Sequence, residues 1–372
     1  MRGRSLIAKP ADLVRGAGVR ARTRDWAPRT RLFAVGERTG WSVDEDAREL
    51  EATARRLGHA VGPPSWARFA GNQAVFLTSH FDALLGPHWR RSSHRLATAY
   101  LHGRPGTPGA PEFDAAYSAL VRDPGRFSAI QVTHSEMRDL VLEAGVASER
   151  VFVVPIGIDV EGFAAGDGSA RSRSRGVLGL PLDAFVIGSF QKDGVGWEEG
   201  LEPKLVKGPD VLVAALERVR NAVPELHVLL TGPARGYVCR ELGRLGIPFV
   251  HTVAADRGEL VRAYHALDAY LVASRQEGGP KGVLEAMATG VPLATTRVGQ
   301  AQEIVEDGRN GLLADVEDAE ALAAALVRIH DDAGLRSSLA AEGRATVERF
   351  AHERLDSAWK PLLDTLVGLE HA

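Results

Sequence analysis

The feature that most constrains this fold is the alternation of short apolar runs with longer amphipathic segments. In the first half of the chain, the apolar runs are residues 32–35, 74–78, 97–101, 129–133 and 151–154. Helical patterns lie between several of these runs, at residues 42–57, 113–122 and 135–144. Short continuous apolar runs are typical of strands that are buried on both faces of a sheet. The sequence therefore predicts a parallel sheet with helices on both faces.

A second series of the same kind follows. Its apolar runs are residues 184–189, 226–231, 249–250, 269–272 and 292–296, and its helices start near Pro209, Gly236, Arg257, Pro280 and Gln300. Because 372 residues exceed the size of one ordinary hydrophobic core, the two series predict two Rossmann-like α/β domains. Residues 157–175 lack hydrophobic periodicity and are rich in Gly, Ala, Ser and Arg, so we expect an exposed linker there.

These patterns predict the organisation of the whole chain. We expect a basic arm at residues 1–30, a first domain at 31–165 and a second domain at 176–356. The helical pattern of residues 344–369 predicts one long helix with a kink at Pro361, because proline lacks the amide that the helix needs.

Charge and cysteine usage narrow the classes of partner. The net charge of -3 argues against a general nucleic-acid binder, which needs a basic excess. The arm and the residue after it carry nine Arg or Lys residues against two Asp residues, and two interpretations stay open: a peripheral contact with an anionic membrane surface or a polyanionic acceptor, or an exposed arm without a binding role. The lone Cys239 excludes an internal disulfide and a cysteine-based metal site, so we expect a cytoplasmic protein.

The richest motif runs from Ser274 to Pro292, from the end of a strand through glycines into a helix. The loop and first helical residues, which are Gly278, Gly279, Pro280 and Lys281, are predicted to bring backbone amides and a helix N-terminus to an anion. Glu277 precedes the helix and Glu285 lies more than one turn inside it, so the two carboxylates address different parts of one elongated ligand. Carboxylates suit vicinal hydroxyls, and free amides suit phosphates.

This motif resembles the E-x7-E signature of glycosyltransferase family 4, and residues 287–292 and 311–313 resemble the same family. The resemblance implies the GT-B fold, in which two Rossmann-like domains face each other across a cleft and a C-terminal kinked helix, here about residues 357–372, crosses back to the first domain. It also implies retaining transfer from a nucleotide-diphosphate sugar without a metal or other cofactor. In this family the first glutamate, here Glu277, contacts the transferred sugar, and the second, here Glu285, holds the ribose hydroxyls.

A second element contains Gly188–Lys192 and Lys207–Asp210. It resembles the family's paired cations for the donor diphosphate. Lys207 matches that pattern well, whereas Ser189 stands where many members have arginine. We assign the second cation to Lys192, and the alternative is an exposed loop lysine. The intervening residues 193–204 are either an acceptor-facing loop or a surface turn.

Other candidates lie at strand ends, where open α/β sheets bind ligands. Gly232 follows the run 226–231, and the resemblance implies that Thr252 and Val253 lie along the nucleobase through backbone atoms; the alternative is a turn that closes the core. In the first domain, His102 resembles a histidine that relatives hold close to the reacting sugar, and the alternative is a structural histidine. Gly40 in the first loop is assigned by resemblance to the acceptor side.

The resemblance thus implies a retaining, metal-independent hexosyltransferase with Glu277, His102 and Lys207 as catalytic residues. Its donor would be a nucleotide sugar, and its acceptor a glycan, a lipid-linked glycan or a small molecule. A role in polysaccharide or glycoconjugate biosynthesis is implied by the family alone. Three alternatives stay open: a nucleotide-sugar epimerase, a phosphorylase, and a nucleotide-sugar-binding protein without activity.

Overall fold

The computed structural model describes residues 31–37, 42–89 and 92–368, which form two compact units, each built on a parallel sheet. The first unit contains residues up to Leu101, residues 114–154 and residues from Asp356 on. The second contains residues 102–113 and 155–355. The basic arm and Gly40 lie outside the described residues.

The sheet of the first unit has five parallel strands in sequential order. They are β1 (Leu32–Val35), β2 (Ala74–Leu77), β3 (Arg95–Ala99), β4 (Ala129–Val132) and β5 (Val151–Val153). Val61 adds a further parallel bridge to Leu32 on the side of β1 that faces away from β2. The chain therefore reverses its direction of winding between β1 and β2, as in doubly wound folds.

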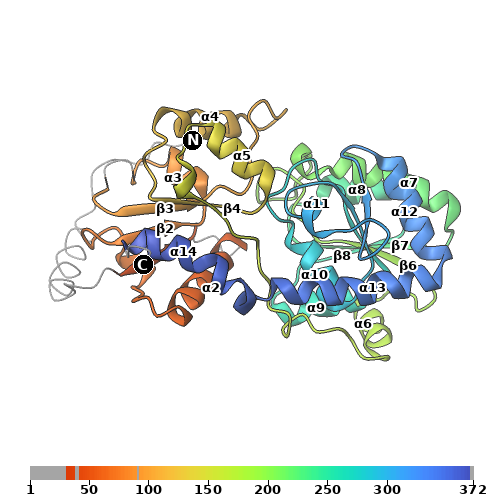
Figure 1. The fold of residues 1–372 in the computed structure, drawn as a ribbon. Coiled ribbons are helices and arrows are strands. Elements are labelled where there is room, and N and C mark those ends of the chain that lie inside the picture. Colours follow the sequence, from red (N-terminus) through yellow and green to blue (C-terminus); the bar gives the residue numbers. More distant parts are fainter. Residues whose placement is uncertain (1–30, 38–41, 90–91, 369–372) are drawn as a thin grey trace. The chain divides into compact units, whose positions relative to one another are not determined.

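Helices cover both faces of this first sheet (Figure 1). They are α2 (Ser42–Arg56), α3 (His80–Leu85), α4 (Pro111–Arg122, from Asp114 on), α5 (Ser135–Glu143) and α14 (Asp356–Val367). Alternate residues of a strand point to opposite faces, and Leu32 accordingly packs with α2 and α14 while Phe33 packs with α3, α4 and α5. On the α14 side, Trp359 makes an edge contact with Phe76 at 5.8 Å between ring centroids.

The second unit has a six-stranded parallel sheet in the order β11-β10-β9-β6-β7-β8. Its strands are β6 (Phe185–Ser189), β7 (Leu226–Thr231), β8 (Phe249–Thr252), β9 (Ala269–Val272), β10 (Leu293–Thr296) and β11 (Leu312–Ala314). In chain order, β6, β7 and β8 run from the centre of the sheet to one edge, and β9, β10 and β11 run from the centre to the other edge. This is the Rossmann strand order, and its switch point lies between β6 and β9.

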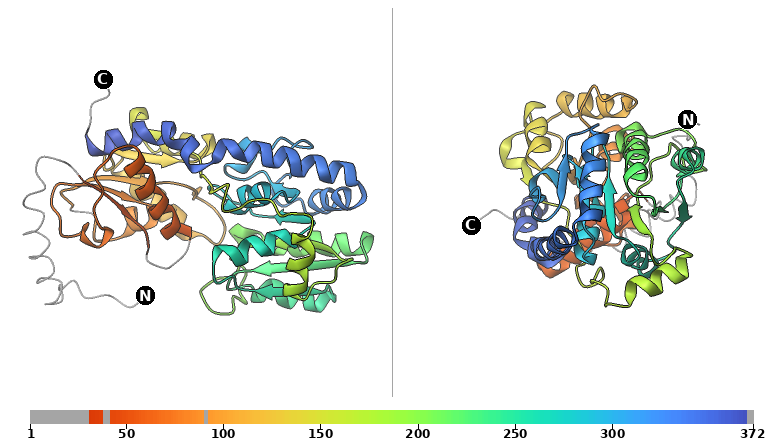
Figure 2. Two further views of the ribbon diagram at one scale, coloured as in Figure 1. Left: turned by 90° about the horizontal axis from the view of Figure 1, so that it is seen from below. Right: turned by 90° about the vertical axis from the view of Figure 1, so that its right-hand side faces the viewer.

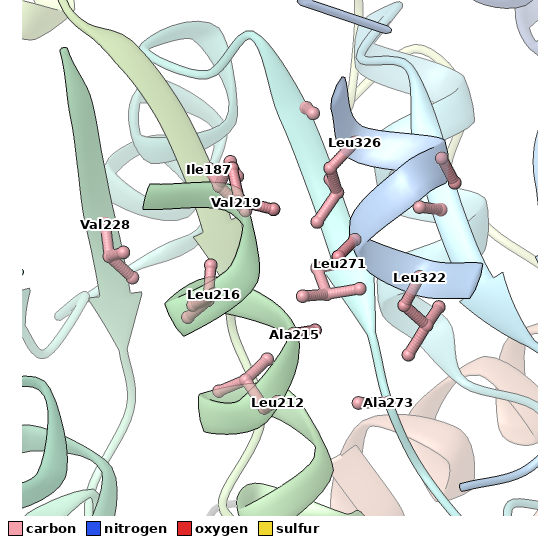
Figure 3. Close-up of a cluster of buried hydrophobic side chains, with 14 of the residues drawn as sticks. Ile187, Leu212, Ala215, Leu216, Val219, Val228, Leu271, Ala273, Leu322 and Leu326 are labelled. Carbon is pink, nitrogen blue, oxygen red and sulfur yellow. The ribbon is translucent and has the colours of Figure 1, made fainter. Parts of the chain in front are cut away.

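The reversal places helices on both faces of this sheet (Figure 2). The second unit contains α6 (Ala170–Leu178), α7 (Pro209–Ala222), α8 (Gly236–Leu245), α9 (Arg257–His265), α10 (Lys281–Thr289), α11 (Ala301–Ile304), α12 (Ala319–Asp331) and α13 (Ala333–Val347). Figure 3 shows Leu216 of α7 and Leu326 of α12 directed at the strand residues Ile187 and Leu271. Helices α9, α10 and α11 pack on the opposite face. None of the helices in the described ranges has the length and apolar character needed to cross a membrane.

The predicted exposed linker at residues 157–175 is wrong at both ends, whereas residues 164–169 are exposed and lie outside helices and strands. Ile158, Val160 and Phe163 are buried in the core of the second unit, and α6 starts at Ala170. Arg175 of that helix is fully buried. Its guanidinium donates to the carbonyl oxygens of Ala184 and Ala266 and to Asp268 Oδ2 at 2.6–2.9 Å. These tertiary contacts, which leave no periodic pattern, hold the segment.

The predicted continuous helix from residue 344 to 369 is also wrong. Helix α13 ends at Val347, two 3₁₀ turns follow, and α14 begins at Asp356 with Pro361 inside it. The interruption arises because the chain pairs with Ile158 at this point. The amide of Ile158 donates to the Phe350 carbonyl, and the amide of His352 donates to the Ile158 carbonyl. The break therefore results from a long-range contact and not from proline.

We predict that Arg175→Met lowers the free energy of unfolding of the second unit by about 3 kcal/mol, because it leaves buried carbonyl oxygens without donors and Asp268 with one cation fewer. Urea denaturation followed by circular dichroism measures the change. Arg173→Met on the exposed side of the same helix is the control, and we expect a loss of less than about 1 kcal/mol there. Equal effects of the two substitutions would contradict the role of Arg175.

Candidate functional site

The polar residues of interest gather at the switch point of the second sheet. Strands β6 and β9 lie side by side, and the loops that follow them leave towards opposite edges of the sheet. Residues 190–207 follow β6, and residues 273–280 follow β9. A crevice at such a reversal is where open parallel sheets bind ligands. The motifs that sequence alone singled out therefore share one place in the fold.

At the centre of this place, Lys207 pairs with Glu277. Lys207 Nζ lies 2.6 Å from Glu277 Oε2, and Ser274 Oγ donates to Glu277 Oε1 at 2.8 Å. The Glu277 side chain is 8% exposed and that of Lys207 is 20% exposed. Burial alone would raise the pKa of Glu277, but the charge and hydrogen bonds of Lys207 and Ser274 hold it below its ordinary value. Glu277 is therefore an ionised, fixed carboxylate.

The backbone around Gly208 brings Lys207 to this carboxylate. Gly208 has a positive φ of 60°, and a Cβ at this position would overlap the carbonyl oxygen of Ala273. The carbonyl oxygen of Val206 accepts from the amides of Arg275 and Gln276 at 2.9 and 3.1 Å. The turn that ends at Lys207 is thus fastened directly to the loop that carries Glu277. Only glycine permits both the left-handed backbone and the close approach.

His102 lies beside the same pair. Its segment, residues 102–113, belongs to the second unit, where Gln276 accepts from the Arg104 amide at 3.2 Å and donates to Thr107 Oγ1 at 2.6 Å. Burial, together with the charge of Lys207, lowers the pKa of His102 to about 4 against the opposing effect of Glu277. At neutral pH His102 is an uncharged imidazole, which can both donate and accept a hydrogen bond.

Glu285 is held by two buried tyrosines. Tyr264 donates from its hydroxyl to Glu285 Oε2 at 2.7 Å, and its ring packs against that of Tyr270 with 5.2 Å between the ring centroids. Tyr270 Oη accepts from the Phe190 amide at 3.1 Å, just beyond β6. Burial raises the pKa of Tyr264 well above its ordinary value, and the charge of Glu285 adds to this effect. The tyrosines therefore connect the end of β6 to α10 and orient the carboxylate.

The glycine-containing loop leads into α10 as predicted, with one shift. Pro280 is the residue before the helix and not its first residue, and Lys281 begins the helix. The carbonyl oxygen of Gly278 accepts from the Gln300 amide at 2.9 Å. Gly279 packs so closely against Ile156 and Gln300 that a Cβ would meet both. The loop is held in place while the amides of the first helical turn lie at an N-terminus, where anions bind well.

Lys192 follows β6 but is partly engaged elsewhere. Its ammonium donates to the Gly194 carbonyl oxygen at 3.2 Å and lies 4.6 Å from the centroid of the Trp197 ring. Burial and the nearby Lys207 lower its pKa, and Asp193 opposes them. The structure therefore brings Lys192 near Lys207, with its charge directed at the inserted segment.

The inserted residues 193–204 are anchored in the core at their base. Asp193 and Arg235 are both fully buried, with 3.0 Å between Oδ2 and the guanidinium. The amides of Gly236 and Tyr237 at the start of α8 donate to carbonyl oxygens of Glu199 and Gly200. The tip remains exposed. Whether it faces an acceptor stays a prediction.

The candidates at the ends of β7 and β8 lie farther along the same edge. The amide of Gly232 donates to the Thr252 carbonyl oxygen at 3.1 Å, and Val253 is 59% exposed. Strand β8 is three positions from β9, or about 14 Å at about 4.8 Å per strand. Such a separation suits opposite ends of one elongated ligand. The Thr252 carbonyl oxygen also continues the pairing of β7 with β8, so a structural role for this residue stays open.

Three residues in or beside the site were not predicted from sequence, namely Lys204, Tyr264 and Ser274. Lys204 is half-buried, and Tyr264 is fully buried on a helix whose pattern indicates only core packing. A Lys-x-x-Lys spacing up to Lys207 was the available signal for Lys204, whereas no local signal marks Tyr264. Within the described residues, no group of three or more His, Cys, Asp or Glu side chains is placed to hold a metal ion.

The part of the chain that contains Lys207, Glu277 and Glu285 is similar in sequence to a known family. A family model described as Glycosyl transferases group 1 matches residues 200–332. The D-inositol 3-phosphate glycosyltransferase of Xylanimonas cellulosilytica is 35% identical over 239 residues, which are 61% of this chain and 54% of that protein. The enzyme of the same name from Corynebacterium jeikeium is 32% identical over 250 residues, 64% of this chain and 57% of that protein. The chain thus spans little more than half the length of these relatives.

Comparisons of structure concern the fold of the whole chain. The structure of Anabaena Alr3699/HepE in complex with UDP and glucose has a TM-score of 0.71 and 18% identity, covering 90% of this chain and 99% of that one. Sucrose-phosphate synthase from Thermosynechococcus elongatus has a TM-score of 0.64 and 22% identity, covering 80% and 74%. At these identities the likeness concerns the fold alone, and it confirms the predicted GT-B fold.

The low pKa of His102 predicts a pH dependence of stability. An unfolded histidine takes up a proton as the pH falls through about 6.5, whereas folded His102 resists it down to about 4. The unfolded state therefore binds more protons between these values, and stability falls as the pH falls. His102→Gln should lose less stability between pH 7 and pH 5 than the wild type, as measured by urea midpoints. Other histidines with lowered pKa values, such as His59, are shared by both proteins. An identical loss in both would contradict the assignment.

Proposed function

We propose that the chain transfers a sugar from a nucleotide-diphosphate sugar to a hydroxyl group of an acceptor, since residues 200–332 match the family model of the group 1 glycosyl transferases. The observation that carries this proposal is the buried pair of Lys207 and Glu277 at the switch point, next to the N-terminus of α10. One fixed cation and one fixed carboxylate there suit a ligand that has phosphates beside hydroxyls.

The site accommodates the parts of such a donor in order. Lys207 and the first amides of α10 would bind the diphosphate, since both favour negative charge. Glu285, whose carboxylate Tyr264 holds in place, would accept hydrogen bonds from the ribose hydroxyls. The base would extend along the ends of β7 and β8, towards Gly232, Thr252 and Val253. Glu277 would then lie beside the transferred sugar.

The same groups would promote the reaction. The bond between the anomeric carbon and the β-phosphate oxygen breaks, and negative charge develops on that oxygen. The acceptor oxygen bonds to the anomeric carbon and its proton passes to the departing diphosphate. Lys207 and the dipole of α10 stabilise this charge more strongly as it grows, which lowers the barrier. Neutral His102 can hydrogen-bond a hydroxyl of the sugar without repelling Lys207. These groups supply the positive charge for the leaving group, so the proposal includes no metal ion.

The proposal also covers the donor sugar, the stereochemistry, the acceptor and the location of the protein. We propose a hexosyl donor, supported by a solved structure of Anabaena Alr3699/HepE in complex with UDP-glucose, and retention of configuration, supported by the resemblance of the motifs. A glycan, a lipid-linked glycan or a small molecule would serve as acceptor, in polysaccharide or glycoconjugate biosynthesis. A cytoplasmic location, with the basic arm on the inner face of the membrane, completes the proposal. The main alternatives are an epimerase of the free nucleotide sugar and a binding protein without turnover.

We predict that Glu285→Gln raises the Kd for the nucleotide sugar at least tenfold, or about 1.4 kcal/mol, because the amide is a weaker acceptor for the ribose hydroxyls than the carboxylate. Calorimetry would be carried out with donors identified from a panel of nucleotide sugars. Glu320→Gln on the exposed first turn of α12 is the control, and we expect less than a twofold change.

The same panel tests the reaction type. Released nucleoside diphosphate should require an added acceptor and persist in excess EDTA. Conversion of the donor sugar without an acceptor would favour the epimerase, and donor binding without turnover would favour the binding protein. A loss of turnover in EDTA that added metal restores would overturn the metal-independent mechanism. Unchanged binding in Glu285→Gln would overturn the placement of the ribose.

A further inference from the structure

We infer that Lys204 is a phosphate-binding residue of this site and acts together with Lys207. The inference rests on the proposed function and adds to it a residue from the inserted segment. Lys204 lies three residues before Lys207, at the start of the 3₁₀ turn that Lys207 ends. Its carbonyl oxygen accepts from the Lys207 amide at 2.8 Å. The two lysines are therefore parts of one short, fixed turn.

The backbone of Lys204 is fixed from both sides. Its amide donates to the Asp193 carbonyl oxygen at 2.7 Å, at the base of the inserted segment. Arg275, in the loop before Glu277, donates to the Leu205 carbonyl oxygen at 2.8 Å. A turn that is tied both to the insertion and to the Glu277 loop restricts where the lysine side chain can reach. Lys204 is thus positioned by the same contacts that position Lys207.

The Lys204 side chain is half-buried, and its ammonium group makes no hydrogen bond or ion pair with any residue that the structure describes. Burial lowers its pKa, and Lys207 and Lys192 lower it further, while Glu277 and Glu112 oppose them. Two lysines of like charge act on the Lys204 ammonium and no ion pair with a described residue compensates for them, so an anion bound beside it would be favoured. A bound phosphate would supply the missing hydrogen bonds and the opposite charge.

The surroundings of the three lysines differ in a way that singles out Lys204. Lys192 is engaged by the Gly194 carbonyl oxygen and by the Trp197 ring. Lys207 is engaged by Glu277. Of the three lysines, Lys204 therefore has the most hydrogen-bond donors available for a new ligand. Its positive charge also adds to that of Lys207, which Glu277 neutralises.

The buried pair of Asp193 and Arg235 explains how the insertion can hold a lysine here. Both side chains are fully excluded from solvent, and Arg235 also donates to the carbonyl oxygens of Ser189 and Thr231. The pair therefore joins the base of the insertion to the ends of β6 and β7. Because Asp193 supplies the carbonyl oxygen that receives the Lys204 amide, the lysine is fixed to the core of the unit and not to an exposed tip.

The inference is tested by measuring, with calorimetry, the Kd values of a nucleoside, its monophosphate and its diphosphate. The base of these ligands is the one that the wild type prefers. We expect Lys204→Ala to weaken diphosphate binding 10- to 50-fold and nucleoside binding less than twofold, since only the diphosphate reaches the lysine. Lys204→Arg should remain within about fivefold of the wild type. Arg240→Ala, which removes an exposed cation on α8, is the control for net charge and should change binding less than twofold.

The outcomes separate this inference from the proposed function. If the wild type binds the diphosphate and turns over the donor while Lys204→Ala binds it equally well, the inference alone is wrong. A raised KM for a phosphorylated acceptor with unchanged diphosphate binding would place the phosphate on the acceptor and also overturn it. If the wild type binds no nucleoside diphosphate, the proposed function itself is wrong. The thermal midpoint shows whether Lys204→Ala is folded. If it is not folded, the diphosphate Kd of Lys204→Arg tests the inference, and a loss of more than about fivefold would contradict it.

Discussion

The ion pair between Lys207 and Glu277 is the interaction on which the rest of the site depends. A buried carboxylate is costly unless a cation and hydrogen bonds compensate for lost water, and Lys207 and Ser274 provide both. Their arrangement requires the turn at Gly208 to pass against the Ala273 carbonyl oxygen, where no side chain fits. The chemistry of the site is therefore tied to one close contact between two backbone segments.

The strand order explains why these segments meet. Lys207 and Glu277 are 70 residues apart, but β6 and β9 are neighbours at the reversal of the second sheet. The same neighbours are joined on the other side of the site by Tyr270, which receives the Phe190 amide and supports Tyr264 against Glu285. Two carboxylates on α10 and its preceding loop are thus each held by a group from another element. Such support keeps a polar site rigid before a ligand arrives.

The sequence predicted the architecture well, because buried parallel strands give apolar runs that are easy to recognise. All ten predicted runs are strands, whereas β11, with three residues at an edge, gave too little pattern. The two failures, the linker before α6 and the helix across residues 348–355, occur where Arg175 and Ile158 make long-range contacts. Local periodicity cannot register such contacts.

For the site, the motif residues were predictable and their supporting residues were not. Glu277, Glu285 and Lys207 lie in recognisable local patterns, and the structure brings Glu277, Lys207 and His102 together. Tyr264 was missed because its contact with Glu285 joins residues distant in sequence, and Lys204 was missed because nothing but its spacing to Lys207 marks it within the inserted segment. Gly40 lies outside the described residues, so its assignment stays a prediction.

A crystal structure of the protein with a nucleoside diphosphate would test the central claim most directly. We expect a phosphate oxygen within about 3 Å of Lys207 Nζ, a second phosphate contact at the N-terminus of α10, and a ribose hydroxyl on the Glu285 carboxylate. Lys207 and Glu285 would then bind adjoining parts of one ligand. A diphosphate bound away from the switch point of β6 and β9, with the pair of Lys207 and Glu277 in no contact with it, would contradict the account.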